Sequence, residues 1–171
     1  IDTETEEFDV DDTTAIPRLV VLTATNESRK TYLIHPCHAR DFLNQHRDIP
    51  FVLHNVAFDR VVLLEATGVD LADWAACNRI IDTGLLYQLV RLAEIGLVPG
   101  KWGLDVLVQR YLHYTLPKDE SVRCTFGVYI REFGVVPLNE FRGEHRVYAA
   151  MDPLATRLLC EKLLDAARAV A

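Results

Sequence analysis

The sequence predicts a single α/β domain with a mixed β-sheet, and three observations support this fold class. Two β-rich apolar runs, residues 19–23 and 31–35, are separated by the polar turn 26–28, a pattern typical of a β-hairpin. Short apolar runs then alternate with helical patterns, an order typical of helices that pack on a sheet. The chain has 171 residues and no internal repeat, and this length fits one compact domain.

The other elements follow from the spacing of apolar residues. Strands are expected over residues 51–54 and 79–82, and helices over 39–46, 56–66, 85–94 and 104–112. Residues 116–137 carry two prolines, two glycines and mixed polarity, so a long loop with little regular structure is expected there. The last helix covers about 140–170, with a kink expected near Pro153 because proline disfavours helical angles in the residue before it.

The composition excludes several classes of protein. Half of the residues are apolar and a quarter are charged, so the chain buries a real core and is neither disordered nor fibrous. No run approaches the roughly 18 to 20 consecutive apolar residues of a membrane helix, and no basic-then-apolar leader marks export. The four cysteines are scattered without a CxxC pair, which indicates reduced thiols and a cytoplasmic location.

The formal net charge of −7 argues against a protein that coats nucleic acid through a basic surface. An enzyme that grips only a few nucleotides remains compatible with this charge. A carboxylate cluster adds negative charge to the count, and bound cations cancel that charge locally. Net charge therefore does not decide the function.

The first acidic motif is Asp2-Thr3-Glu4. Residues i and i+2 of a strand point to the same face, so both carboxylates project together. Taken alone, such a triplet is more often the solvated end of a strand than a metal site. Only Ile1 precedes the motif, although a strand normally supplies several apolar residues first. We therefore expect residues 1–171 to be an excerpt that lacks the start of its first strand.

The second motif runs from His54 to Asp59, where a strand passes into a helix. Asp59 lies near the helix start, where the helix dipole favours a negative charge, and Asn55 stands at the expected N-cap. Capping is one interpretation of these residues. The other directs Asp59 across the strand ends toward Asp2 and Glu4.

The third motif pairs Tyr148 with Asp152. Residues four apart share one face of a helix, so a phenol and a carboxylate are aimed into the same space. In isolation this spacing is typical of an ordinary surface pair.

Taken in order, acid-x-acid, Asn-x-x-x-Asp and Tyr-x-x-x-Asp resemble the three exonuclease motifs of the DEDD superfamily in its tyrosine subtype. The histidine subtype has a histidine five residues before the last aspartate, and this chain has Val147 there. The resemblance extends to the strand end 80–83 and the helix 103–112, and spans nearly the whole chain. The sequence is similar to the proofreading domains of family A DNA polymerases and to ribonuclease D.

This resemblance implies a ribonuclease H-like fold, with a mixed central sheet flanked by helices, over one exonuclease domain at residues 1–171. It also implies a site for two divalent cations, Mg²⁺ or Mn²⁺. Asp2 would bridge both cations, Glu4 and Asp152 would complete the tighter site, and Asp59 would hold the second cation through water. Tyr148 would orient the attacking water.

The resemblance also implies contacts to the substrate. Four residues are expected at the terminal nucleotides: Thr3, Phe8, Asn55 and Phe58. For Phe8, a place in the core is an equally good interpretation. Asp82 matches a family position, but we interpret it as a cap at a strand end and leave it out of the ligand set.

Segment 117–143 has no clear counterpart in the family. Two interpretations of it stay open: a loop that contacts the substrate, or a docking surface. Its cations Lys118, Arg123 and Arg131 are candidates for phosphate contact, although solvated loop charges are the favoured interpretation.

The residue types suit phosphodiester hydrolysis. Two cations about 4 Å apart acidify a bound water and neutralise the leaving oxygen, and oxygen ligands select hard ions such as Mg²⁺ or Mn²⁺. The expected activity removes mononucleotides from the 3′ end of DNA, as in proofreading. The expected substrate is a single strand or frayed 3′ end, with a polymerase module in the same chain as an expected partner.

Two alternatives stay open. The motifs do not tell DNA from RNA, so a ribonuclease D-like exoribonuclease fits them as well. A catalytically silent ribonuclease H-like module, kept for interaction with a partner, is the alternative of a different class. A zinc site at His35-Pro36-Cys37-His38 is rejected because no second ligand pair accompanies it.

Overall fold

The computed structural model describes residues 1–7, 15–117 and 120–170. Strands β1 (Asp2–Thr5), β2 (Leu19–Thr25) and β3 (Thr31–Ile34) form an antiparallel sheet in that order. Strands β4 (Phe51–Leu53) and β5 (Ile80–Asp82) pair in parallel. The backbone nitrogen of Ile1 donates a 2.7 Å hydrogen bond to the Val52 carbonyl, which places the start of β1 beside β4. The mixed α/β fold predicted from the sequence is confirmed.

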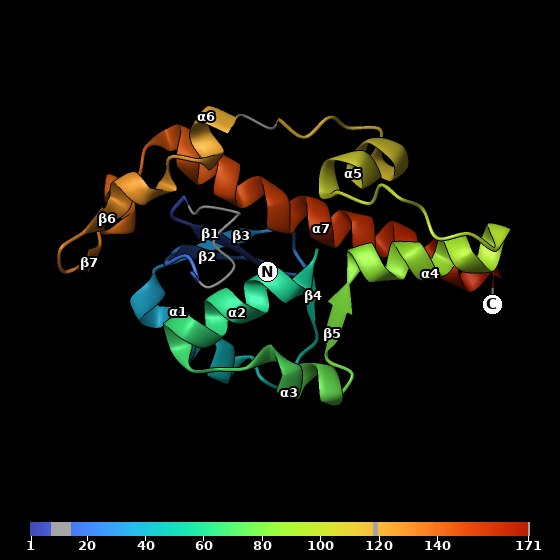
Figure 1. The fold of residues 1–171 in the computed structure, drawn as a ribbon, viewed down its shortest axis with the longest axis horizontal. Helices are drawn as coiled ribbons and strands as arrows, with labels where there is room; N and C mark the ends of the chain where they lie inside the picture. The colour runs from blue at the N-terminus through green and yellow to red at the C-terminus, as the bar shows by residue number, and fades with distance from the viewer. Residues whose placement is uncertain (8–14, 118–119, 171) are drawn as a thin grey trace.

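Helices cover both sides of the strands (Figure 1). The helices are α1 (Pro36–Gln45), α2 (Val56–Thr67), α3 (Leu71–Ala76), α4 (Thr83–Ile95), α5 (Leu104–Leu112), α6 (Glu120–Arg123) and α7 (Gly143–Val170). The long helix α7 packs on β2 and β3 and also contacts α4 and α5, while α1 and α2 pack against the same strands from the other side. The sheet therefore lies between two helical layers.

The core is divided by the sheet, because successive residues of a strand point to opposite faces. On β2, Leu22 packs in a cluster with Leu43 of α1 and Leu63 of α2. Its neighbour Val21 packs on the α7 side in a cluster that includes Ala149. Burial on both faces explains why β2 reads as a continuous apolar run instead of an alternating one.

Most predicted elements appear within one to three residues of their expected ends. The sequence pattern missed α3, which has only six residues and anchors itself through buried Leu71 and Trp74. The expected kink does not interrupt α7, which runs unbroken through the buried Pro153. No helix among residues 1–7, 15–117 and 120–170 is long and apolar enough to cross a membrane.

The predicted loop 116–137 is wrong in part. It contains α6, the 3₁₀ helix η1 (Phe126–Tyr129), and a small antiparallel pair of strands, β6 (Ile130–Arg131) and β7 (Gly134–Val135). The segment is held by aromatic packing: the rings of Tyr129 and Phe141 stack with their centroids 3.9 Å apart, and Phe126 is fully buried. Through η1 the segment packs beside β1 and β2.

Candidate active site

Four carboxyl groups from three elements lie within electrostatic reach of one another. Asp2 and Glu4 belong to β1, Asp59 to the first turn of α2 and Asp152 to α7. Burial raises the pKa of Asp2 well above its ordinary value, and repulsion from Asp59, Glu4 and Asp152 raises it further. The fold thus brings together acidic residues that are up to 150 positions apart in the sequence.

Glu4 is the acid with an unsatisfied oxygen. Its residue is 8% exposed, and its Oε1 is buried without a hydrogen bond to any residue that the structure describes. Burial raises its pKa to about 8; the charge of Asp152 adds to this rise and the cation Arg123 opposes it. A buried carboxylate oxygen without a donor is costly unless another positive group meets it. A divalent cation is such a group, so Glu4 fits the predicted ligand role.

Asp59 is held in place by Thr3. The hydroxyl of Thr3 donates a 2.8 Å hydrogen bond to Oδ1 of Asp59, and both residues are buried. Burial raises the pKa of Asp59 to about 6, while the Thr3 hydrogen bond works against this rise by stabilising the charged form. The result is a carboxyl group that titrates near neutral pH and has one oxygen oriented by β1.

Tyr148 stands one helical turn before Asp152, and both side chains line the same cleft. Burial raises the pKa of the Tyr148 phenol above its ordinary value, and the charges of Asp152 and Glu4 raise it further. The phenol therefore remains protonated at neutral pH and is able to donate a hydrogen bond. Its ring packs at a tilt against Phe126, with the centroids 6.0 Å apart.

A cleft of about 580 Å³ opens beside these residues. Tyr148 and Asp152 line one wall, Asn55 lies at the β4–α2 junction, and Arg123 comes from α6. Trp102 also lines the cleft and packs closely on Gly84. A Cβ atom at Gly84 would lie 2.7 Å from Cε3 of Trp102, so this close approach requires glycine.

The β4–α2 junction is shaped by Asp82 at the end of β5. Its carboxylate accepts backbone hydrogen bonds from Asn55 (3.2 Å) and Val56 (2.9 Å) at the start of α2. It also accepts from Gly84 (2.8 Å) and Leu85 (3.2 Å) at the start of α4. The interpretation of Asp82 as a cap is confirmed, and this single carboxylate caps two helices.

Asn55 occupies the N-cap position of α2, but its side chain makes no capping hydrogen bond. Of the two interpretations of the second motif, side-chain capping by Asn55 is not observed, because the Asp82 carboxylate satisfies the helix start instead. Asn55 adopts a left-handed backbone conformation with φ of 63° and ψ of 56°. Asparagine is one of the few residues that tolerate this conformation, which leaves its amide exposed at the cleft.

A comparison with models of known protein families identifies the family of this chain. The family model described as 3′-5′ exonuclease matches residues 1–167. The chain belongs to the 3′-5′ exonuclease family. The match includes every residue of the predicted site, from Asp2 to Asp152, and confirms the resemblance to the DEDD superfamily. A search of curated proteins found no match.

The four predicted substrate contacts of this exonuclease lie in different surroundings. Asn55 lines the cleft, whereas Phe58 is half-buried against the core between the sheet and α2. The Thr3 hydroxyl is engaged with Asp59. Phe8 lies outside the described residues. The four substrate contacts and the tyrosine subtype stay predictions.

The ligand set of the exonuclease also stays a prediction. Among the residues that the structure describes, no three Asp, Glu, His or Cys side chains already converge into a group able to hold a metal ion. Crowded carboxylates repel one another, and a bound cation reverses that repulsion. Asp59 also has one oxygen turned to Thr3.

Arg123, which the sequence favours as a solvated loop charge, is exposed and also lines the cleft of this exonuclease with Tyr148. Its positive charge opposes the rise in the pKa of Glu4. No periodic pattern marks this position, because α6 has only four residues. A single cation next to a buried apolar residue, here Val122, is the signal that marks Arg123 in the sequence.

Proposed function

We propose that this protein is a two-metal-ion 3′→5′ exonuclease that releases mononucleotides from the 3′ end of a DNA strand. One observation carries the proposal: Asp2, Glu4, Asp59 and Asp152 interact electrostatically beside a cleft that also contains a protonated tyrosine. Three of these acids, Asp2, Glu4 and Asp59, have raised pKa values, which is typical of a functional site.

The donor set suits two hard divalent cations, Mg²⁺ or Mn²⁺, because its ligands are carboxylate oxygens. In this proposal Asp2, Glu4 and Asp152 would hold one cation, and Asp2 and Asp59 would hold the other. When bound, the cations supply a nucleophilic water and neutralise charge on the leaving oxygen. The buried, unsatisfied Oε1 of Glu4 supports this assignment, since a cation gives that oxygen a partner.

The role of Tyr148 follows from its protonation. A phenol whose pKa is raised does not act as a general base at neutral pH. Its hydroxyl instead donates a hydrogen bond, and so orients a water molecule or a phosphate oxygen beside Asp152. Packing against Phe126 limits the rotation of the ring and keeps the hydroxyl directed to the site.

The cleft favours a single strand as substrate. Trp102 offers an aromatic face for stacking of a base, while Lys101 supplies an exposed cation and Asn55 an exposed amide. Stacking and backbone contacts tolerate every base, so we infer activity on any sequence with a single-stranded or frayed 3′ end. We further propose a role in proofreading during DNA replication or repair, beside a polymerase module in the same chain, in the cytoplasm.

The experiment follows a 5′-labelled single strand through time with Mg²⁺ or Mn²⁺ and with a chelator. The proposal predicts a ladder that shortens from the 3′ end, mononucleotide products, and no reaction with the chelator. Asp152→Asn removes nearly all activity, whereas Tyr148→Phe keeps about 1 to 10% because it loses one hydrogen bond to a charged group. Equal loss in both variants contradicts the role of Tyr148.

The same assay tests the two alternatives. Faster shortening of an RNA strand than of a DNA strand of equal sequence indicates an exoribonuclease and contradicts the DNA assignment. A wild-type protein that binds the strand but releases no mononucleotide with either cation is a silent interaction module. The presence of all four acids together favours an active enzyme over the silent module.

A further inference from the structure

Arg123 is a cation placed at the acidic site without belonging to any of the three motifs. It is the last residue of α6, is exposed, and lines the cleft together with Tyr148 and Asp152. Its positive charge opposes the rise in pKa of both Glu4 and Tyr148. Arg123 therefore lies at the cleft, within electrostatic reach of both Glu4 and Tyr148.

The backbone on both sides of Arg123 is anchored. Val122 is buried among Val20, Val21 and Ala149, and Phe126 is fully buried in the same cluster. The segment around Arg123 is thus held to the core through Val122 and Phe126, while Arg123 itself is exposed and lines the cleft. The four-residue α6 packs on α7, the helix that carries Tyr148 and Asp152.

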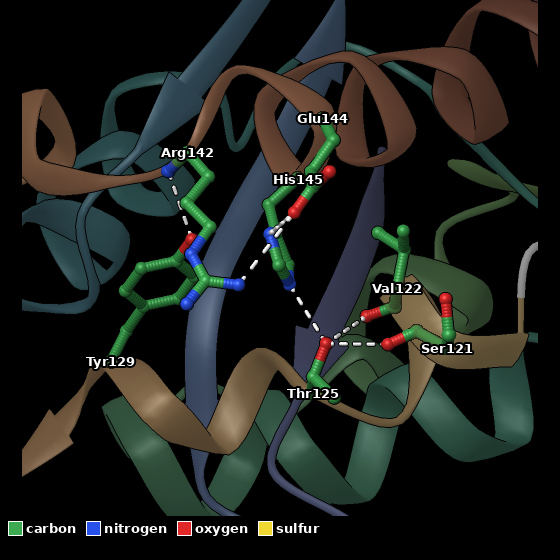
Figure 2. A network of polar contacts seen from close by, with 7 residues as sticks. All are labelled: Ser121, Val122, Thr125, Tyr129, Arg142, Glu144 and His145. Carbon is green, nitrogen blue, oxygen red and sulfur yellow. Dashed lines mark hydrogen bonds and ion pairs between the residues drawn. The ribbon is translucent and has the colours of Figure 1, made fainter.

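A hydrogen-bond network that ends on the buried His145 fixes the same turn (Figure 2). The hydroxyl of Thr125 lies 2.7 Å from the Ser121 carbonyl and 3.0 Å from the Val122 carbonyl, and it donates to them. The hydroxyl has a single hydrogen, so it accepts from Nε2 of His145, 3.0 Å away. His145 belongs to α7 and is 1% exposed. The network therefore joins the turn that carries Arg123 to the helix that carries Tyr148.

The other cations of this segment differ from Arg123. Arg131 donates to the carbonyls of Val128 and Ile130 in its own turn. Lys118 lies outside the described residues. Within the described part of segment 117–143, Arg123 is thus the cation that lines the cleft.

We propose that Arg123 binds the scissile phosphate of the strand, and that Thr125 is a positioning residue that acts through Arg123. This inference rests on the proposed exonuclease function. Carboxylates repel a phosphodiester, so a cation on the cleft side of the site attracts the strand to it. A guanidinium group matches two phosphate oxygens with parallel N–H donors, which an ammonium group cannot do. The Arg123 side chain lies near both Glu4 and Tyr148. It is therefore assigned to the phosphate that reacts, and not to a phosphate further along the strand.

The test compares Arg123→Ala, Arg123→Lys and the matched control Arg168→Ala, which removes an exposed arginine near the end of α7. We expect kcat on a DNA strand to fall about tenfold to a hundredfold in Arg123→Ala, with a smaller change in KM, because charge on the phosphate grows in the transition state. Arg123→Lys retains part of the activity, and Arg168→Ala equals the wild type. Unchanged kcat in Arg123→Ala overturns the proposal, and an effect confined to KM overturns the assignment to the scissile phosphate.

A binding measurement separates this inference from the proposed function. Deoxythymidine 5′-monophosphate is titrated into each protein with Mn²⁺ present, and its affinity is expected to fall in Arg123→Ala. If the wild type shows no nuclease activity, the proposed function fails, while weaker nucleotide binding still supports the phosphate contact. Stronger Mn²⁺ binding in Arg123→Ala with unchanged nucleotide affinity shows that Arg123 is only a counterion of the carboxylates, and overturns the inference.

The role of Thr125 is tested with Thr125→Val and Thr125→Ser. Thr125→Val is expected to lower kcat less than Arg123→Ala does, and Thr125→Ser to restore it because the hydroxyl returns. In the double variant Thr125→Val with Arg123→Ala, kcat is expected to be no lower than in Arg123→Ala alone. Thr125 acts through the Arg123 side chain, which this variant lacks. Additive losses overturn the positioning role. Urea unfolding of each variant verifies that the folded fraction is equal under the assay conditions.

Discussion

The hydroxyl of Thr3 donates a hydrogen bond of 2.8 Å to Oδ1 of Asp59 and thereby joins β1 to the first turn of α2. Thr3 is 7% exposed and Asp59 is 3% exposed, so water does not compete for this bond. Burial raises the pKa of Asp59 to about 6, and the bond from Thr3 is the largest effect that opposes the rise. The residue between the two acids of the first motif thus controls the charge of the third acid.

Replacement of Thr3 by valine removes this hydrogen bond while keeping the shape of the side chain. We expect the pKa of Asp59 to rise further above 6 in Thr3→Val, because the charged form loses a donor. The pKa is measured on metal-free protein by the ¹³C chemical shift of the Asp59 carboxyl group as a function of pH. Thr3→Ser is the control and should titrate like the wild type. An identical titration in Thr3→Val contradicts the proposed control by Thr3.

Asp82 is expected to matter for stability because its carboxylate caps two helices. Asp82→Ala leaves four backbone N–H groups without their acceptor, at the starts of α2 and α4. Loss of a helix cap costs about 1 kcal/mol, so we expect unfolding in urea to require about 2 kcal/mol less. Asp82→Asn keeps one carbonyl oxygen as an acceptor and should lose less. Equal stability of Asp82→Ala and the wild type contradicts the double cap.

Gly84 is expected to tolerate no side chain because Trp102 covers it. In Gly84→Ala the new Cβ atom would lie 2.7 Å and 2.9 Å from Cε3 and Cζ3 of Trp102, so the indole ring has to move. Overpacking of this kind costs about 1 to 3 kcal/mol. The shift in tryptophan fluorescence and the urea midpoint measure the change. Gly100→Ala, where the added atom meets nothing within 4 Å, should keep the wild-type urea midpoint.

The raised pKa values of the acids predict how stability depends on pH in metal-free protein. Asp59 titrates near 6 instead of 3.8, and Glu4 near 8 instead of 4.5, so the folded state binds more protons than the unfolded state between these values. The contribution of both groups to the free energy of unfolding therefore decreases as pH rises from about 4 to about 8. Glu4→Gln is expected to remove the part of this pH-dependent decrease in stability that Glu4 contributes.

Divalent cations reverse the trend because they bind the deprotonated carboxylates. We expect Mn²⁺ to raise the urea midpoint strongly at about pH 8 and little at about pH 5. Thermal or urea unfolding in a series of buffers, each with Mn²⁺ or with a chelator, measures the effect. Stabilisation by Mn²⁺ that is equal at both pH values argues against binding by these acids.

The regular elements were predictable from sequence because each has a local signature. The hairpin of β2 and β3 follows from two β-rich runs around a polar turn, and α5 from its apolar face. The helix α3 lacks such a signature because six residues span less than two turns. The packing of Phe126 and Tyr129 under α7 depends on partners far along the chain, so no local pattern predicts the order in segment 117–143.

The site could be predicted in outline for a similar reason. The spacing within each motif fixes which side chains share a face, and the family resemblance supplied the order of the motifs. The hydrogen bond between Thr3 and Asp59 joins two motifs, so neither motif predicts it alone. Asp82 was predicted as a cap at its own strand end, but the start of α2 that it also caps lies 26 residues earlier in the chain.

The most direct test of the account is the anomalous scattering of Mn²⁺ in crystals of this exonuclease soaked with the cation. We predict two peaks beside the cleft, among the acids of β1, α2 and α7, one within bonding distance of Asp2, Glu4 and Asp152 and the other within reach of Asp2 and Asp59. Crystals of Asp152→Asn grown in the same way should lose at least one peak. Full Mn²⁺ occupancy elsewhere, with no peak at these four carboxylates, contradicts the central claim.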